Sequence, residues 1–218
     1  LHALDRRQRQ MCIRDRKESA HARVNLIGEH TDYTGGYVMP TLLSFKNTIE
    51  ISQNNSNEFT VYSQHFKEKK TFNDFKKSIN NEWVDYIKGC LHIFFDENKI
   101  SSRFLNIFIS SDIPLERGIS SSSALCVATL KALNTFFETK IKDPEIAKLA
   151  KKVEFNYIGV SGGIMDQMVS SIGIHGKAFF MNCKNLEYEL INFPENWKFC
   201  LIDSEVPVSY THLTLPTI

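Results

Sequence analysis

The chain has 218 residues, enough for one large domain or two small ones with a buried core. Its residues are 42% hydrophobic and 23% charged, close to the averages for globular proteins, which excludes wholesale disorder. No stretch approaches the roughly 20 consecutive apolar residues that a membrane-spanning helix needs. The five cysteines form no C-x-x-C pair, which argues against a zinc knuckle or a disulfide framework and indicates a reducing cytoplasm.

The formal net charge of +1 is unevenly distributed, because residues 1–16 hold five of the eight arginines. The rest of the chain is slightly acidic, so neither a nucleic acid nor a membrane is an expected partner. The segment RRQRQMCIRDR within 1–16 resembles translated sequencing-adapter sequence, and VSYTHLTLPTI (208–218) resembles its counterpart at the other end. We therefore expect 1–16 and 208–218 to be non-native tails and 17–207 to be the natural domain.

The predicted elements of the first part of the chain alternate between strands and helices. Apolar runs predict strands at 23–27, 48–52, 59–63 and 104–109. Apolar residues at helical spacing predict an amphipathic helix over 83–95, whose aromatic side chains we interpret as core rather than as a cofactor stack. A glycine- and serine-rich turn then leads into a helix over 121–137.

The second part continues the alternation. Asp143 is the predicted N-cap of a helix that has Pro144 at its first position and runs to about Tyr157. The pair Gly162–Gly163 breaks the chain before a shorter helix that extends through Gln167. Three further strands are expected at 177–182, 187–191 and 199–203. Because no internal repeat or linker separates these elements, the sequence predicts one mixed α+β domain.

The first motif is RVNLIGEHTDY (23–33), which is followed by two glycines. A strand that ends in flexible glycines is where a rigid scaffold presents side chains to a ligand. The polar side chains that follow this strand are Glu29, His30, Asp32 and Tyr33. Carboxylates and an imidazole suit sugar hydroxyls, although a solvated turn with a capping aspartate is the alternative. A zinc site at His21 and His30 is disfavoured, because no third ligand is spaced to join them.

The second motif is SSDIPLERGISSSSA (110–124), in which Gly118 permits a sharp turn before a run of serines. Free backbone N–H groups and the helix dipole at the start of the following helix favour an anion such as a nucleotide phosphate. The serine hydroxyls could also ligate Mg²⁺. The motif lacks the Gly-Lys-Ser/Thr of a Walker loop, and an ordinary N-cap with adjacent serines is the alternative.

The third motif consists of Glu154 and the segment GGIMDQ (162–167). An aspartate such as Asp166, placed among glycines and bulky apolar residues, is costly unless it is paired or catalytic. The alternative is a plain N-cap for the helix that follows.

In this order and spacing, the three motifs resemble the GHMP small-molecule kinases, and galactokinases most closely, over residues 20–206. RVNLIGEHTDY is similar to the galactokinase signature, GISSSSA to the phosphate loop, and GGIMDQ to the segment of the catalytic aspartate. The resemblance implies the GHMP-kinase N-terminal domain, a mixed sheet backed by helices that contains a left-handed βαβ unit. From the same resemblance, we expect the C-terminal domain of the family to be absent from this chain.

The resemblance also implies transfer of the γ-phosphoryl of ATP to the anomeric hydroxyl of α-D-galactose, with ATP and Mg²⁺ as cofactors. Asp166 would be the general base, and Arg23 would keep it ionised and stabilise charge in the transition state. The residues implied for the sugar are Glu29, His30, Thr31, Asp32 and Gly163. The residues implied for the ATP phosphates are Glu116, Arg117, Gly118, Ile119, Ser120, Ser121 and Ser122. Ser122 and Glu154 would hold Mg²⁺. These parts suit phosphoryl transfer, which needs mainly alignment and charge compensation.

Two departures from the family pattern stand out. His21–Ala22 replaces the usual Pro-Gly before Arg23, and Glu116–Arg117 replaces small residues in the phosphate loop, where a carboxylate should repel phosphate. A related GHMP kinase acting on N-acetylgalactosamine or arabinose is one alternative function. A non-catalytic sugar and ATP sensor is another, although it need not keep Arg23, Glu154 and Asp166. We expect the full-length protein to be cytoplasmic and monomeric.

Overall fold

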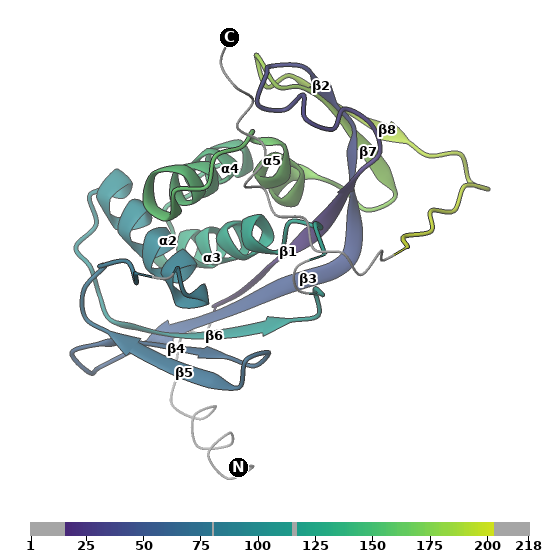
Figure 1. The fold of residues 1–218 in the computed structure, drawn as a ribbon. Helices are drawn as coiled ribbons and strands as arrows, with labels where there is room; N and C mark the ends of the chain where they lie inside the picture. The colour runs from purple at the N-terminus through teal and green to yellow at the C-terminus, as the bar shows by residue number, and fades with distance from the viewer. Residues whose placement is uncertain (1–15, 80, 115–116, 203–218) are drawn as a thin grey trace.

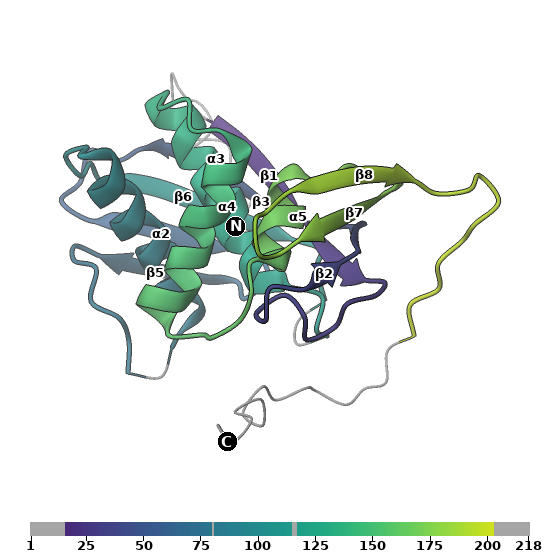
Figure 2. The same cartoon turned by 90° about the horizontal axis from the view of Figure 1, so that it is seen from above.

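A mixed β-sheet forms one layer of the molecule, and the helices lie on one of its faces (Figures 1 and 2). The computed structural model describes residues 16–79, 81–114 and 117–202. The strands are β1 (Arg16–Asn25), β2 (Tyr37–Val38), β3 (Pro40–Gln53), β4 (Phe59–Ser63), β5 (Glu68–Phe72), β6 (Leu105–Ser111), β7 (Lys177–Asn182) and β8 (Tyr188–Asn192). The helices are α2 (Trp83–Asn98), α3 (Ser121–Phe137), α4 (Asp143–Lys152), the π-helical turn η1 (Val153–Ile158) and α5 (Met165–Ile172). None of these helices is long and apolar enough to cross a membrane.

The strands hydrogen-bond in the order β2-β7-β3-β6-β4-β5, while β1 also pairs with β3 and β8 with β7. The long strand β3 runs antiparallel to β1, β6 and β7 along different parts of its length. By contrast, β4 runs parallel to β6, and the connection between them includes α2. The predicted mixed sheet backed by helices is therefore confirmed, and the left-handed crossing of its βαβ unit stays a prediction.

The main hydrophobic core lies between the helices α2 and α3 and the strands β3, β4 and β6. Ile87 and Phe94, two of the apolar residues at helical spacing in α2, are fully buried in this core. The ring of Phe59 lies 5.1 Å from that of Phe104 and 5.2 Å from that of Phe72, measured between centroids. Phe95 is also buried in this core, and Trp83 and Tyr86 pack against it, so the interpretation of the aromatic residues in 83–95 as core residues is confirmed.

A second cluster fixes α5, the helix that carries Asp166, against the sheet. Its buried members from α5, β2 and β7 include Val38, Met165, Met168, Val169 and Phe179. In addition, the Ser170 hydroxyl donates a 2.8 Å hydrogen bond to the His21 carbonyl, which ties α5 to β1. The C-terminal half of α5 is therefore held against the middle of β1.

Several element boundaries differ from the sequence-based predictions. The first strand spans Arg16–Asn25 rather than 23–27, because its polar N-terminal half pairs with β3 from Arg16 onward. Arg16 therefore lies in β1, whereas the rest of the expected tail at 1–16 lies outside the described residues, as does 208–218. The prediction that α5 ends at Gln167 was wrong, since its apolar spacing continues to Ile172. The strands β2 and β5 were not predicted.

The prediction of Asp143 as an N-cap was also wrong. Lys142 has the extended backbone of an N-cap, and its carbonyl accepts hydrogen bonds from the amides of Glu145 and Ile146. Asp143 is therefore the first residue of α4. The continuous helix expected up to Tyr157 instead changes to the π-helical turn η1 after Lys152.

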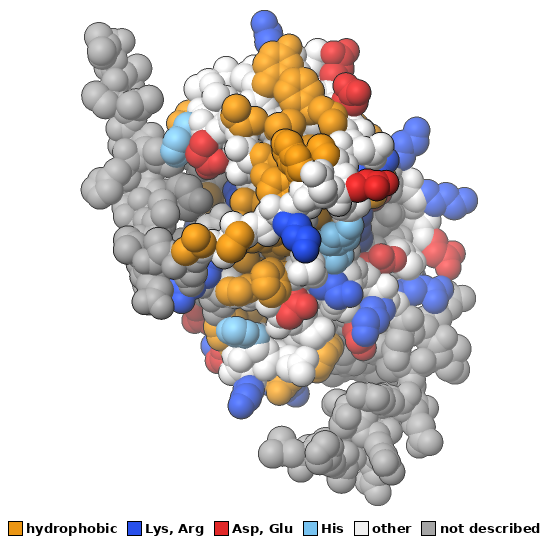
Figure 3. Space-filling view, turned by 90° about the vertical axis from the view of Figure 1, so that its right-hand side faces the viewer, with side chains coloured by type: hydrophobic (Ala, Val, Ile, Leu, Met, Phe, Trp, Pro, Cys, Tyr) orange, Lys and Arg blue, Asp and Glu red, His pale blue; other side chains and the backbone are white. Residues whose placement is uncertain are grey.

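The chain after β8 forms an extended arm without regular secondary structure. Of the strand predicted at 199–203, residues 199–202 are irregular, and Asp203 lies outside the described residues. A strand needs a neighbour for its backbone hydrogen bonds, and no strand of the described chain pairs with this arm. Hydrophobic side chains gather in a stripe on this side of the molecule (Figure 3). Exposed large residues of β8 and the arm are Tyr188, Ile191, Trp197, Phe199 and Leu201.

Candidate active site

A bidentate ion pair between Arg23 and Asp166 forms the centre of the candidate site. The guanidinium donates from Nε to Asp166 Oδ1 at 2.7 Å and from Nη2 to Oδ2 at 2.9 Å. Arg23 lies near the end of β1 and is buried, while Asp166 lies in the first turn of α5 and its side chain is one-quarter exposed. Two parallel charge-assisted hydrogen bonds fix both distance and direction, so the carboxylate is oriented while part of it stays accessible.

The phosphate-loop motif is attached to the same pair. Arg23 Nη1 donates to the Gly118 carbonyl at 2.9 Å, and its backbone amide donates to the Ile119 carbonyl at 3.2 Å. The Ser120 hydroxyl donates to Asp166 Oδ2 at 2.5 Å. Arg23 thus connects β1 to the phosphate loop and to α5, which are distant from it in sequence.

Ser120 lies at the N-terminus of α3 but does not cap the helix with its side chain. It occupies the N-cap position with a left-handed φ of 62°, and its side chain makes no capping hydrogen bond because it points to Asp166. The backbone N–H groups of the first helical turn are then not capped by this side chain. Such groups, together with the helix dipole, favour an anion at this end of α3.

Glu154 in η1 is a buried carboxylate whose two oxygens are both engaged. Ser122 donates to Oε1 at 2.8 Å, Ser123 donates to Oε2 at 2.7 Å, and the Gln167 amide also donates to Oε2. Burial raises the pKa of Glu154, and the hydrogen bonds from Ser123, Gln167 and Ser122 partly oppose this shift.

The residues around Glu154 fit Mg²⁺. This ion prefers oxygen ligands and usually keeps waters or substrate phosphates in its shell, so it needs only one or two protein ligands. Ser122 and Glu154 supply a hydroxyl and a carboxylate side by side. Gln167 Oε1 adds a buried oxygen that has no hydrogen-bond partner. Within the described residues of 16–202, no cluster of three or more His, Cys, Asp or Glu that could hold a metal occurs.

The loop after β1 places the carboxylate of Asp32 near that of Asp166. Burial raises the pKa of Asp32, and the nearby charge of Asp166 raises it further, while hydrogen bonds from backbone amides, including that of Gly163, lower it. A Cβ atom at Gly163 would lie 2.2 Å from Asp32 Oδ2, so only glycine permits this approach. The carboxylate of Asp32 is therefore held against the backbone of the GGIMDQ segment.

The other residues expected at the sugar side have different surroundings. The Thr31 hydroxyl lies 2.7 Å from both the Gly28 and the Tyr37 carbonyls and holds the shape of the loop. Glu29 and His30 are exposed, and Glu29 accepts a 2.9 Å hydrogen bond from Asn25. The structure thus gives Thr31 a role in the loop and leaves Glu29 and His30 open to solvent.

Most of the expected site residues are brought together by the fold. Those within one connected set of contacts are Arg23, Asp32, Gly118, Ile119, Ser120, Ser122, Glu154, Gly163 and Asp166. Ser121 begins α3, and its carbonyl accepts from Asn47, while Arg117 is exposed and Glu116 lies outside the described residues.

The sequence reasoning missed three side chains of this site. Ser123 and Gln167 lie within the quoted motifs, but nothing in the letters showed that both donate to Glu154. Lys151 precedes Glu154 by three residues, a helical spacing that could have suggested a shared face. Its ammonium donates to the Gly162 carbonyl.

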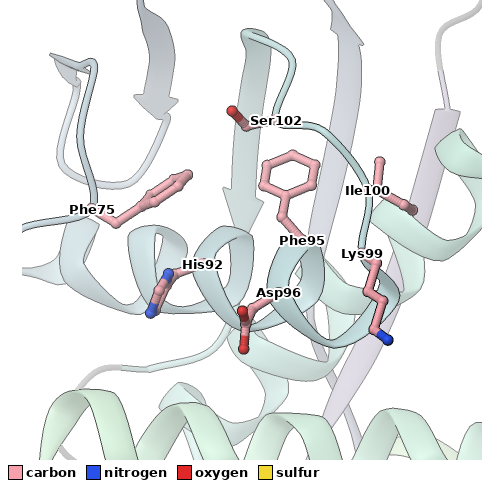
Figure 4. A pocket seen from close by; sticks show the side chains of 7 residues that line it. All are labelled: Phe75, His92, Phe95, Asp96, Lys99, Ile100 and Ser102. Atoms are coloured by element: carbon pink, nitrogen blue, oxygen red, sulfur yellow. The ribbon is translucent and has the colours of Figure 1, made fainter.

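A shallow cavity of about 390 Å³ lies apart from these residues, at the C-terminal end of α2. Its lining residues are Phe75, His92, Phe95, Asp96, Lys99, Ile100 and Ser102 (Figure 4). None of the residues expected in the site lines it, so the candidate active site is defined by the contacts around Arg23 and Glu154.

Comparison with protein families gives two matches. The family described as "GHMP kinases N terminal domain" matches residues 85–173, and the "Galactokinase galactose-binding signature" matches residues 18–53. The first match covers the α3 N-terminus, Glu154 and Asp166, and the second covers Arg23 and Asp32. Together they include every element that contributes to the site.

Similar proteins include galactokinases of two archaea. The chain is 39% identical to galactokinase of Pyrococcus furiosus over 175 residues, which are 80% of this chain and 49% of the relative. It is 37% identical to galactokinase of Thermococcus kodakarensis over 193 residues, which are 87% of this chain and 51% of the relative. The chain therefore spans about half the length of the curated relatives that it matches.

Solved structures with a similar fold include Lactococcus lactis galactokinase complexed with galactose, with a TM-score of 0.79 and 28% identity over 88% of this chain and 51% of that one. Methanococcus jannaschii mevalonate kinase follows the same fold, with a TM-score of 0.70 and 23% identity. The fold and the family match together show that the chain contains a GHMP kinase N-terminal domain. The curated relatives named above are galactokinases, and residues 18–53 match the galactose-binding signature of galactokinases.

Proposed function

We propose that this chain is the N-terminal portion of an ATP-dependent sugar 1-kinase that phosphorylates α-D-galactose at its anomeric hydroxyl. The galactose-binding signature, the galactokinase relatives and the likeness to a galactokinase complexed with galactose all support this substrate. We expect its small-molecule ligands to be galactose and ATP. We also expect the full-length protein to be a monomer in the cytoplasm.

The reaction requires the anomeric oxygen to attack the γ-phosphorus while the bond from that phosphorus to the leaving ADP oxygen breaks. Asp166 accepts the proton of the attacking hydroxyl, and the paired Arg23 keeps the carboxylate aligned and compensates its charge. Asp32 and Gly163 lie beside Asp166 and orient the sugar, together with Glu29 and His30 at the mouth of the loop. Thr31 holds the loop in shape.

The α3 N-terminus and residues 116–122 bind the phosphates of ATP, through backbone N–H groups and serine hydroxyls. Ser122 and Glu154 would hold Mg²⁺, which would neutralise charge on the transferring phosphoryl group. Ser123 and Gln167 orient the Glu154 carboxylate toward this role.

The observation that carries the proposal is the double contact of Arg23. One guanidinium binds both oxygens of Asp166 and the carbonyl of Gly118, so the base and the phosphate loop have a fixed separation. Phosphoryl transfer depends on such alignment far more than on covalent help from the protein. A solvated turn or a plain helix cap would not need this arrangement.

Sugar-dependent release of ADP by the complete protein that carries this sequence tests the proposal. Galactose, N-acetylgalactosamine, arabinose and glucose are compared, and the product is identified by ³¹P NMR as the 1-phosphate. We expect galactose to give the highest kcat/KM. Preference for another sugar would contradict the galactose assignment, and calorimetric binding of galactose and ATP without turnover would contradict the kinase assignment.

A further inference from the structure

Lys151 lies next to the site and is half-buried, whereas most lysine side chains extend into solvent. It lies in the last turn of α4, and its ammonium donates a hydrogen bond to the carbonyl of Gly162. The ring of Phe155 lies 5.4 Å from the same nitrogen, in a cation–π contact. The ammonium thus contacts the loop that leads into α5, through Gly162, and η1, through Phe155.

The peptide group that accepts from Lys151 also contacts Asp32. The carbonyl of Gly162 and the amide of Gly163 belong to one planar peptide unit, and the Asp32 carboxylate lies directly against Gly163, where a Cβ atom would be 2.2 Å from Asp32 Oδ2. In a trans peptide the carbonyl and the N–H point in opposite directions. The unit therefore has a cation bound at its negative, carbonyl end and an anion next to its Gly163 end, so both charges interact favourably with the dipole of the peptide.

The charge surroundings of Lys151 support the same placement. Burial lowers the pKa of Lys151, whereas the carboxylates of Glu154, Asp32 and Asp166 raise it. These three carboxylates belong to the proposed metal, sugar and base positions respectively. A positive charge among them reduces their mutual repulsion, which for Asp32 and Asp166 adds to the effect of burial in raising the pKa of Asp32.

We propose that Lys151 is a positioning residue for the sugar, which acts through the Gly162–Gly163 peptide to hold the Asp32 carboxylate in its binding orientation. This inference rests on the proposed sugar kinase function. It predicts that loss of the ammonium weakens sugar binding. The affinity for ATP should stay nearly unchanged, because the phosphate loop is held by Arg23.

The test compares Lys151→Met, Lys151→Arg and the matched control Lys152→Met in the complete protein. Lys152 is the adjacent lysine, but it is exposed and pairs with Glu97 at 2.6 Å. We expect Lys151→Met to raise the KM for galactose about tenfold, because it removes a charge-assisted hydrogen bond. The KM for ATP should stay within about twofold, and Lys151→Arg, which keeps charge and donors, should restore most of the sugar affinity.

Calorimetric titration with galactose in the absence of ATP measures the same effect independently of turnover, and thermal unfolding verifies that each variant is folded. If Lys151→Met does not fold, the comparison of Lys151→Arg and Lys151→Gln decides in its place. An unchanged galactose affinity, or equal increases in the KM for galactose and ATP, would overturn the role of Lys151. A wild-type protein that phosphorylates no sugar would instead overturn the proposed function, while galactose titration of the variants would still decide the role of Lys151.

Discussion

Arg23 donates hydrogen bonds to both carboxylate oxygens of Asp166, at 2.7 and 2.9 Å, although 143 residues separate the two in sequence. The same guanidinium donates to the Gly118 carbonyl at 2.9 Å, so Arg23 connects the end of β1 to the phosphate loop and to the start of α5. A shift of any one of the three would change the position of the carboxylate. The ion pair is therefore both a structural joint and the core of the proposed chemistry.

Replacing Asp166 by Ala tests the carboxylate at this joint. We expect kcat to fall by about 10²–10⁴, because the general base is lost, while the affinity for ATP stays nearly unchanged. Steady-state kinetics and calorimetric ATP titration of the complete protein measure the two effects. Unchanged turnover would remove Asp166 from the mechanism.

Replacing Arg23 by Lys tests the geometry of the joint rather than its charge. A lysine ammonium cannot form the two parallel hydrogen bonds to Asp166 and also reach Gly118. We expect kcat to fall about 100-fold, equivalent to the loss of one or two charge-assisted hydrogen bonds of about 1.5–3 kcal/mol each. Wild-type kcat in this variant would show that charge alone is sufficient.

The elements with strong apolar patterns were predictable from the sequence. The bounds of β4, α3 and β7 agree with the predictions to the residue, because their buried faces leave clear spacing in the letters. The polar first half of β1 and the lysine-rich β5 have no such signal, since strand pairing holds them at the sheet. The arm at 199–202 has the composition of a strand but no partner in the described chain.

The site was predictable at the level of motifs but not of contacts. The resemblance selected Arg23, Glu154 and Asp166, which the fold brings near one another, and their roles stay predictions. The partners of these residues depend on how α4, η1 and α5 approach one another, which local sequence does not specify. For this reason Lys151, Ser123 and Gln167 emerged only from the structure.

Two adjacent glycines offer a matched test of the sugar side. A Cβ at Gly163 would lie 2.2 Å from Asp32 Oδ2, whereas a Cβ at Gly162 would meet nothing within 4 Å. We expect Gly163→Ala to displace Asp32, to raise the KM for galactose at least tenfold and to destabilise the protein by about 1–3 kcal/mol. Gly162→Ala should match the wild type in both respects. Equal behaviour of the two variants in kinetics and chemical denaturation would contradict the close approach of Asp32 and Gly163.

Glu154 gives a prediction about stability and pH. Burial raises its pKa above the value of 4.5 for a free side chain, so the ionised carboxylate costs folding free energy. That cost is absent below the unfolded pKa, grows as the pH rises through 4.5 toward the folded pKa, and is complete above it. Because the amide of glutamine carries no charge, Glu154→Gln should raise the melting temperature of the 218-residue chain at pH 7. The gain should shrink as the pH is lowered toward 4.5.

The control is Glu145→Gln, which removes an exposed carboxylate paired with Lys148 on α4. Exposed pairs of this kind contribute about 0.3–0.5 kcal/mol, so its melting temperature should change little at any pH. Differential scanning calorimetry between pH 4.5 and 7 measures both variants. A Glu154→Gln chain that is less stable than the wild type by the same amount across this range would show that its hydrogen bonds from Ser122 and Ser123 outweigh the cost of the buried charge. A gain confined to neutral pH would instead mark Glu154 as a carboxylate kept at the expense of stability, as expected for a residue whose charge is needed to bind a cation.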